Sequence, residues 1–109
     1  MWNAPSIEEL NKMPMLCDSA DMPLQSRMIH QHYFLGGSDW YIAEYSPDSR
    51  IFFGYAILSN DRQNSEWGYL SLDEMMDIKT PQGFEIDRDL HWEPKKAYDI
   101  PKISEASGW

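Results

Sequence analysis

Residues 40–58 have the sequence WYIAEYSPDSRIFFGYAIL, the densest run of aromatic and aliphatic side chains in the chain. Within this run, residues 51–58 are apolar at both odd and even positions. Successive side chains of a strand point to opposite faces of its sheet, so a strand that is apolar at both parities is covered on both sides. The run therefore predicts a central strand, joined to the strand before it by a turn at Pro47 and Asp48.

Two helices are predicted by their first residues. Ser6 and Glu9 have the spacing of a capping box, in which each residue bonds the backbone amide of the other, and Pro14 ends the helix that they begin. The same pattern at Ser71 and Glu74 predicts a second helix that ends near residue 79.

Alternating and apolar patterns predict further strands around the central one, at residues 27–35, 39–45 and 66–70, with an extended segment at 84–92. The connections between successive strands are short, which favours an antiparallel meander. The expected fold class is α+β, with a meander of about four to five strands and two short helices packed on one face.

The length of 109 residues is that of one domain. The sequence after residue 94 has no period, so we expect a single α+β domain at residues 1–94 and a partly ordered C-terminal tail at 95–109. The single cysteine, Cys17, allows no internal disulfide, and neither a signal peptide nor an apolar run of membrane-spanning length is evident. We expect a cytoplasmic protein that does not bind membranes.

Charge is distributed unevenly along the chain. Between Glu66 and Glu93 there are eight acidic residues and two basic ones, a local charge of −6 within a total of −9. Such a field repels the phosphates of nucleic acids and attracts basic protein surfaces. Direct binding of nucleic acid is therefore disfavoured, and a basic protein partner is favoured.

The residues expected to contact this partner are the acids of the segment together with one aromatic residue beside them. They are Glu66, Trp67, Asp73, Glu74, Asp77, Glu85, Asp87 and Asp89. Carboxylates around a few exposed aromatic rings would give fast, salt-sensitive association and an anchor that is desolvated on binding.

The histidines suggest an alternative to a protein-binding function. His30 and His32 share one parity of a predicted strand, and Asp87, Asp89 and His91 share one parity of another. If those strands came together, the set could bind Zn²⁺ or Fe²⁺, or a small molecule. Two-residue spacing is the ordinary spacing of any strand face, so solvated or cross-strand polar pairs are the simpler interpretation.

Other chemistry finds little support in the sequence. No nucleophile motif and no phosphate-binding glycine loop is present, so neither an enzymatic activity nor a cofactor is expected. Arg88 shares the parity of the apolar residues of its segment, and we expect its guanidinium to pair with Glu74 or Asp77.

Four stretches carry a resemblance to a known family: DWYIAEY at 39–45, IFFGY at 51–55, WGYLSLDEM at 67–75 and FEIDRDLHWEP at 84–94. They resemble a family of small uncharacterised proteins, a domain of unknown function, carried by bacterial plasmids, phages and conjugative elements. The resemblance implies a mobile-element setting in a bacterial host cell, and it supplies no catalytic residues. Together with the charge, it suggests a non-enzymatic acidic factor, such as an anti-CRISPR or anti-restriction inhibitor that acts as a DNA mimic.

Overall fold

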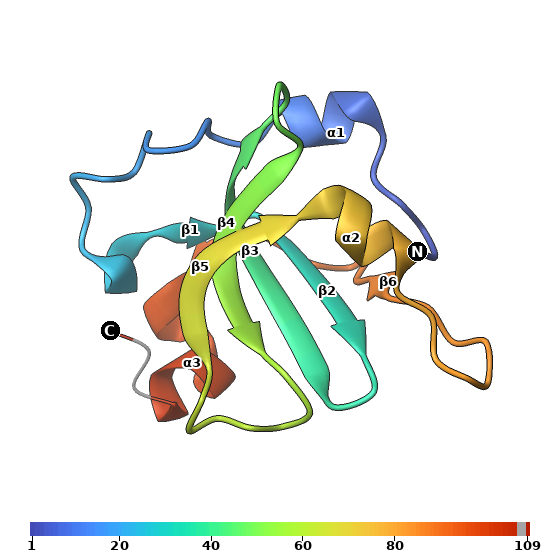
Figure 1. Cartoon of the computed structure of the whole chain (residues 1–109). Helices are drawn as coiled ribbons and strands as arrows, with labels where there is room; N and C mark the ends of the chain where they lie inside the picture. The colour runs from blue at the N-terminus through green and yellow to red at the C-terminus, as the bar shows by residue number, and fades with distance from the viewer. Residues whose placement is uncertain (107–108) are drawn as a thin grey trace.

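The structure is a computed structural model and describes residues 1–106 and 109 (Figure 1). A five-stranded antiparallel sheet has the strand order β5-β4-β3-β2-β6, and β1 and β7 form a second, two-stranded sheet. The strands are β1 Met28–Ile29, β2 Gln31–Leu35, β3 Ser38–Ser46, β4 Ile51–Ile57, β5 Glu66–Ser71, β6 Asp87–Arg88 and β7 Lys95–Lys96. The predicted α+β class and antiparallel meander are confirmed.

The helices are short, and two of them begin where their caps predict. They are α1 Ile7–Asn11, α2 Leu72–Asp77 and α3 Pro101–Glu105, with 3-10 turns η1 Leu24–Ser26 and η2 Ala97–Asp99. Ser6 and Glu9 form the complete capping box of α1, and the Ser71 side chain accepts a hydrogen bond from the Glu74 amide at the start of α2. None of the helices in the described part of the chain has the length and apolar character required to cross a membrane.

Strand β3 lies between two hydrophobic cores, because its alternate side chains belong to different clusters. Trp40 and Ile42 lie in a cluster with buried residues of α1 and α2, whereas Tyr41 and Ala43 lie in a cluster with buried residues of η2 and α3. Every residue of β3 between its two end residues is buried. The sheet is therefore covered on both faces. The two predicted helices share one face, and a third helix, α3, packs on the other.

The C-terminal segment contributes to this second core. Ala97, Ile100 and Ile103 are each at most 3% exposed and pack against the sheet. We expected a partly ordered tail from residue 95 onward, but the described residues up to 106 form β7, η2 and α3 and belong to the packed domain. Residues 107–108 of the expected tail lie outside the described residues.

Two predicted strands differ in extent from those observed. The 27–35 segment is divided at His30, so that β1 pairs with β7 and β2 pairs with β3. The 84–92 segment forms only the short strand β6, which pairs with β2 at the edge of the main sheet. This segment is otherwise irregular, and its course along the sheet edge shapes the candidate site.

Candidate functional site

The segment from Phe84 to Lys95 passes three cavities in turn along the β2 edge of the main sheet. The first has a volume of about 470 Å³ and is lined by Trp2, Phe34, Leu35, Gly36, Thr80, Phe84, Glu85 and Asp87. The second, of about 300 Å³, lies around Arg88, and the third, of about 370 Å³, lies around His32.

The pairing of neighbouring strands places residues that line the first cavity side by side. Phe34 of β2 lies directly opposite Asp87 of β6, and Asp87 also forms a parallel bridge with Trp2 on its other side. The Trp2 amide donates a hydrogen bond to the carbonyl oxygen of Ile86 at 2.8 Å, which extends the sheet by one residue. Residues opposite one another in neighbouring strands share a face. Phe34, Asp87 and Trp2 therefore form one row across the sheet edge.

The aromatic side chains of this cavity are exposed. Trp2 is 41% exposed, Phe34 37% and Phe84 55%. The rings of Trp2 and Phe84 meet edge to face, with centroids 6.1 Å apart and planes at 76°. Large apolar side chains gathered around a hollow with carboxylates beside them are typical of a recognition site. We name the cavity and these five residues, Trp2, Phe34, Phe84, Glu85 and Asp87, the aromatic–acidic face.

The two carboxylates of the aromatic–acidic face have different partners. Glu85 accepts a hydrogen bond from the Met1 ammonium group, which lowers the pKa of the Glu85 carboxyl, and Lys79 lies 3.9 Å from its other oxygen. Asp87 accepts hydrogen bonds through one oxygen only, Oδ1, from the Asn3 side chain and the Arg88 amide, each at 2.8 Å. Its second oxygen, Oδ2, accepts no hydrogen bond from the described residues.

The remaining predicted contact acids do not form one continuous surface with this face. Asp73, Glu74 and Asp77 are exposed on α2, which covers the opposite face of the sheet, and Asp73 pairs with Arg50 at 2.8 Å. Helix α2 reaches the same sheet edge, because the Met1 ammonium group donates to the carbonyl oxygen of Met76. The end of α2 therefore lies near the aromatic–acidic face, but the α2 carboxylates do not line its cavity.

Glu66 and Trp67 lie on β5, at the edge of the sheet farthest from β6. Glu66 is exposed, whereas Trp67 is half-buried, stacked on Phe53 with centroids 5.8 Å apart and packed against the second core. These two predicted contact residues are thus separated by the width of the sheet from Glu85, Asp87 and Asp89, the predicted contacts in the segment of β6.

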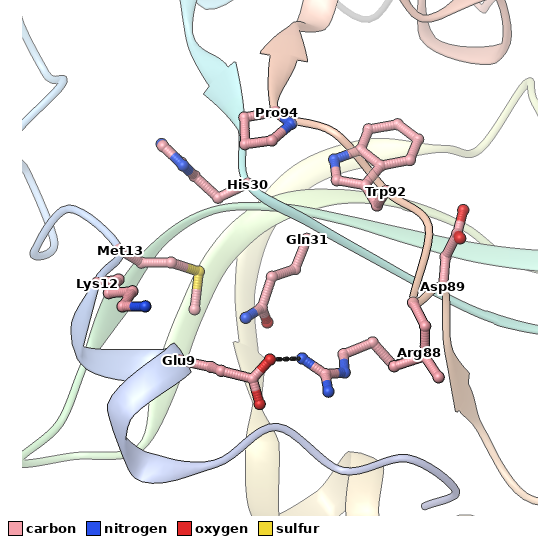
Figure 2. Close-up of a pocket in the computed structure, with 10 residues that line it drawn as sticks. Glu9, Lys12, Met13, His30, Gln31, Arg88, Asp89, Trp92 and Pro94 are labelled. Atoms are coloured by element: carbon pink, nitrogen blue, oxygen red, sulfur yellow. Dashed lines mark hydrogen bonds and ion pairs between the residues drawn. The ribbon is translucent and has the colours of Figure 1, made fainter.

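The second cavity has a mixed polar and apolar lining and contains the ion pair of Arg88 (Figure 2). Figure 2 shows the Arg88 and Glu9 side chains pointing toward each other. Arg88 Nη1 lies 2.6 Å from Glu9 Oε2. Hydrogen bonds from Arg88 and from the Ser6 amide lower the pKa of Glu9 to about 2. The prediction that Arg88 pairs with Glu74 or Asp77 is wrong. The reason is that α1, which supplies Glu9, packs beside β6, and the guanidinium bonds α1 instead.

The third cavity contains a charged cluster built around His32. Its Nε2 lies 2.7 Å from Asp39 Oδ1 and its Nδ1 lies 3.3 Å from Asp89 Oδ2, while its ring stacks on Tyr41. Lys102 of α3 donates to the other oxygen of Asp39, also at 2.7 Å. Burial raises the pKa of Asp39, but the hydrogen bonds from His32 and Lys102 outweigh it, so the net pKa lies below the ordinary value.

Of the residues in the metal hypothesis, His32 and Asp89 are brought into contact, but the three histidines do not share one site. Both ring nitrogens of His32 face carboxylates within the protein, and His30 lines the Arg88 cavity instead. His91 is exposed and contacts Asp89 through its backbone amide. Among residues 1–106 and 109, no group of three or more histidine, cysteine, aspartate or glutamate side chains is arranged to hold a metal ion.

Comparison with known protein families gives one match. A family model described as protein of unknown function (DUF2958) matches residues 19–101 of the chain. The chain belongs to this family. No curated protein and no solved structure matches it. The resemblance to a domain of unknown function is confirmed, and the match is longer than the 39–94 range that carried it.

The DUF2958 match contains most of the aromatic–acidic face but not all of it. Phe34, Phe84, Glu85 and Asp87 lie inside the matched range, as do all seven strands, whereas Trp2 and α1 precede it. None of the three aromatic residues of this face, Trp2, Phe34 and Phe84, is among the site residues predicted from the sequence. Phe34 shares its parity with His30 and His32, and this could have drawn attention to it. Trp2 has no local signal, because its position depends on a bridge to a residue 85 positions later.

Proposed function

We propose that the protein is a non-enzymatic, acidic binding factor that docks on a basic protein surface through the aromatic–acidic face. The observation that carries the proposal is the cavity of about 470 Å³ in which Trp2, Phe34 and Phe84 are each more than one-third exposed beside Glu85 and Asp87. Aromatic anchors near the centre of an interface contribute most of its binding energy, and rings exposed to water gain most when a partner covers them.

Charge supports the same proposal at longer range. The net charge of −9 includes exposed carboxylates on α2, near the aromatic–acidic face, and neither Glu74 nor Asp77 has an ion-pair partner in the described part of the chain. Unpaired surface carboxylates accelerate encounter with a positively charged partner and make it sensitive to salt. The aromatic rings would then provide the contact that holds the complex.

The finer version of the proposal is an anti-defence role in a bacterial cytoplasm, as an anti-CRISPR or anti-restriction inhibitor. Its support is the mobile-element setting that the sequence resemblance implies, together with an acidic surface that can occupy a groove meant for nucleic acid. In this version the partner is a host protein that handles nucleic acid, and the protein itself binds neither nucleic acid nor membrane.

Capture from host lysate tests the proposal. Immobilised wild-type protein is compared with Phe84→Ala/Asp87→Asn and with a matched control, Tyr98→Ala/Asp48→Asn, which removes an exposed ring and an exposed carboxylate far from the face. We expect a basic protein to be retained at low salt by the wild type and the control, and lost from the face variant. Retention of the same proteins by the wild type and both variants would contradict the proposal.

A second candidate function is binding of a small molecule in the third cavity. The feature that favours it is the charged cluster of His32, Asp39 and Lys102 against the Trp92 ring in a hollow of about 370 Å³. Metal analysis and mass spectrometry of the purified protein, under native conditions, test it. A stoichiometric bound species that is lost in His32→Ala would support it, and its absence from protein purified from the native host would contradict it.

A further inference from the structure

The shape of the aromatic–acidic face restricts what its cavity can receive. Trp2 and Phe84 stand at 76° to each other, so one ring presents its face where the other presents its edge. The faces of aromatic rings carry negative partial charge and attract cations placed over them. Two rings in this arrangement form two adjoining walls of a pocket for a cationic group.

A carboxylate oxygen is available beside these walls. Asp87 Oδ1 is occupied by Asn3 and by the Arg88 amide, and Oδ2 has no partner in the described residues. The described chain also contains no buried side-chain nitrogen or oxygen without a hydrogen bond, so Oδ2 of this half-buried residue reaches solvent. The Asp87 side chain is fixed by its two hydrogen bonds, and its free oxygen can accept a hydrogen bond from a ligand.

The row across the sheet fixes the spacing of these groups. Asp87 lies between Phe34 on β2 and Trp2 on the N-terminal segment, so a carboxylate stands between two exposed rings. A planar group that stacks on a ring and also donates to a carboxylate matches this arrangement, and guanidinium has both properties. An ammonium group is compact and strongly hydrated, and it cannot stack.

We infer that the aromatic–acidic cavity is a binding site for an arginine side chain of the basic partner. The guanidinium plane stacks against Trp2 or Phe84 and donates a hydrogen bond to Asp87 Oδ2. This inference rests on the proposed function, because it names the side chain by which the partner is held. The volume of about 470 Å³ is within the range of pockets that hold small ligands, and it accommodates one long side chain.

Titration with small probes, followed by nuclear magnetic resonance of the full chain, tests the inference. The probes are N-acetyl-arginine amide, its lysine counterpart, and its citrulline counterpart, which has nearly the same shape without the charge. The signal is the indole N–H resonance of Trp2, assigned as the resonance that disappears in Trp2→Phe. We expect a saturable shift with arginine and about tenfold weaker binding of citrulline and lysine.

Variants inside and outside the cavity show whether the probe binds at this site. Asp87→Asn and Phe84→Leu should each weaken the arginine probe, whereas Asp48→Asn and Tyr98→Ala, distant from the cavity, should leave it unchanged. Equal binding of arginine and citrulline, equal or stronger binding of lysine, or no saturable shift of the Trp2 resonance would overturn the inference.

The failure of this inference is distinguishable from failure of the proposed function. If Phe84→Ala/Asp87→Asn loses a captured partner but no arginine probe binds at Trp2, the face binds its partner by other contacts and only the inference is overturned. If the arginine probe binds as expected but no basic partner is retained from lysate, the cavity is as inferred and the proposed function is overturned.

Discussion

Asp39 and Lys102 lie 63 residues apart in the chain, and the ammonium group of Lys102 donates to the Asp39 carboxylate at 2.7 Å. Asp39 is only 5% exposed and also contacts His32, so both of its oxygens have partners. This contact ties α3, from the C-terminal segment, to the start of β3 in the main sheet. Together with the burial of Ala97, Ile100 and Ile103, it holds a segment without sequence periodicity in the domain.

Replacing Lys102 by methionine tests this tie. The stem of the side chain is kept, but one oxygen of a buried carboxylate loses its donor, and we expect the free energy of unfolding to fall by about 1–3 kcal/mol. Urea unfolding measures the change. Lys96→Met, at an exposed lysine of β7 without a described ion pair, is the control and should have little effect. Equal stability of the two variants would contradict the role assigned to Lys102.

The Glu9–Arg88 pair predicts a pH dependence. The pKa of Glu9 is about 2 in the folded protein against an ordinary value of 4.5, so the folded state binds this proton less readily than the unfolded state. The stabilisation by Glu9 is complete above pH 4.5 and is lost as the pH falls toward 2.

Urea midpoints between pH 7 and pH 2.5 measure this effect. In Glu9→Gln, which keeps a capping-box side chain, the loss of stability at acid pH should be smaller than in the wild type. Glu8→Gln removes the neighbouring exposed carboxylate and should leave the acid dependence close to that of the wild type. An identical pH profile for Glu9→Gln and wild type would show that the pair contributes nothing to stability.

Alanine substitutions at two glycines that face each other in the sheet should have opposite effects on stability. Gly54 of β4 pairs with Gly68 of β5. A Cβ at Gly54 would lie 2.1 Å from the carbonyl oxygen of Tyr41 in the backbone of β3, whereas a Cβ at Gly68 has nothing within 4 Å. Gly54→Ala should therefore destabilise the protein by about 3 kcal/mol or more, since backbone rather than a flexible side chain must move.

Gly68→Ala should be neutral or stabilise the protein by about 0.5–1 kcal/mol, because glycine weakens a strand interior. Thermal or urea unfolding of the two variants checks both results. Similar destabilisation by the two substitutions would contradict the close approach of Gly54 to the backbone of β3.

Local features of the sequence predicted much of the fold. The central strand, the turns of the meander and the caps at Ser6 and Ser71 depend on side chains within a few residues of one another, and these predictions are confirmed. The extent of the 84–92 segment was not predictable in the same way. Phe84, Ile86 and Leu90 share one parity, but Ile86 is buried whereas Phe84 and Leu90 are exposed. Their shared parity therefore did not place these side chains on one buried face.

The candidate site depends on long-range contacts, which the sequence pattern does not contain. The expected acidic surface assumed that neighbours in sequence share a surface, but β5, α2 and β6 place their carboxylates at different edges and faces. Trp2 enters the site because the N-terminal segment lies beside β6 (Figure 1). Arg88 bonds Glu9 for the same reason. The charge of the segment was therefore predictable, and its arrangement was not.

The measurement that tests the central claim most directly is the affinity for the captured partner. Wild type, Phe84→Ala, and the control Tyr98→Ala are titrated with the purified partner by calorimetry at low and at high salt. The account predicts that Phe84→Ala raises Kd at least about tenfold at both salt concentrations, because the ring is the anchor of the interface, while Tyr98→Ala does not change it. Equal affinity of wild type and Phe84→Ala would contradict the claim that the aromatic–acidic face is the binding surface.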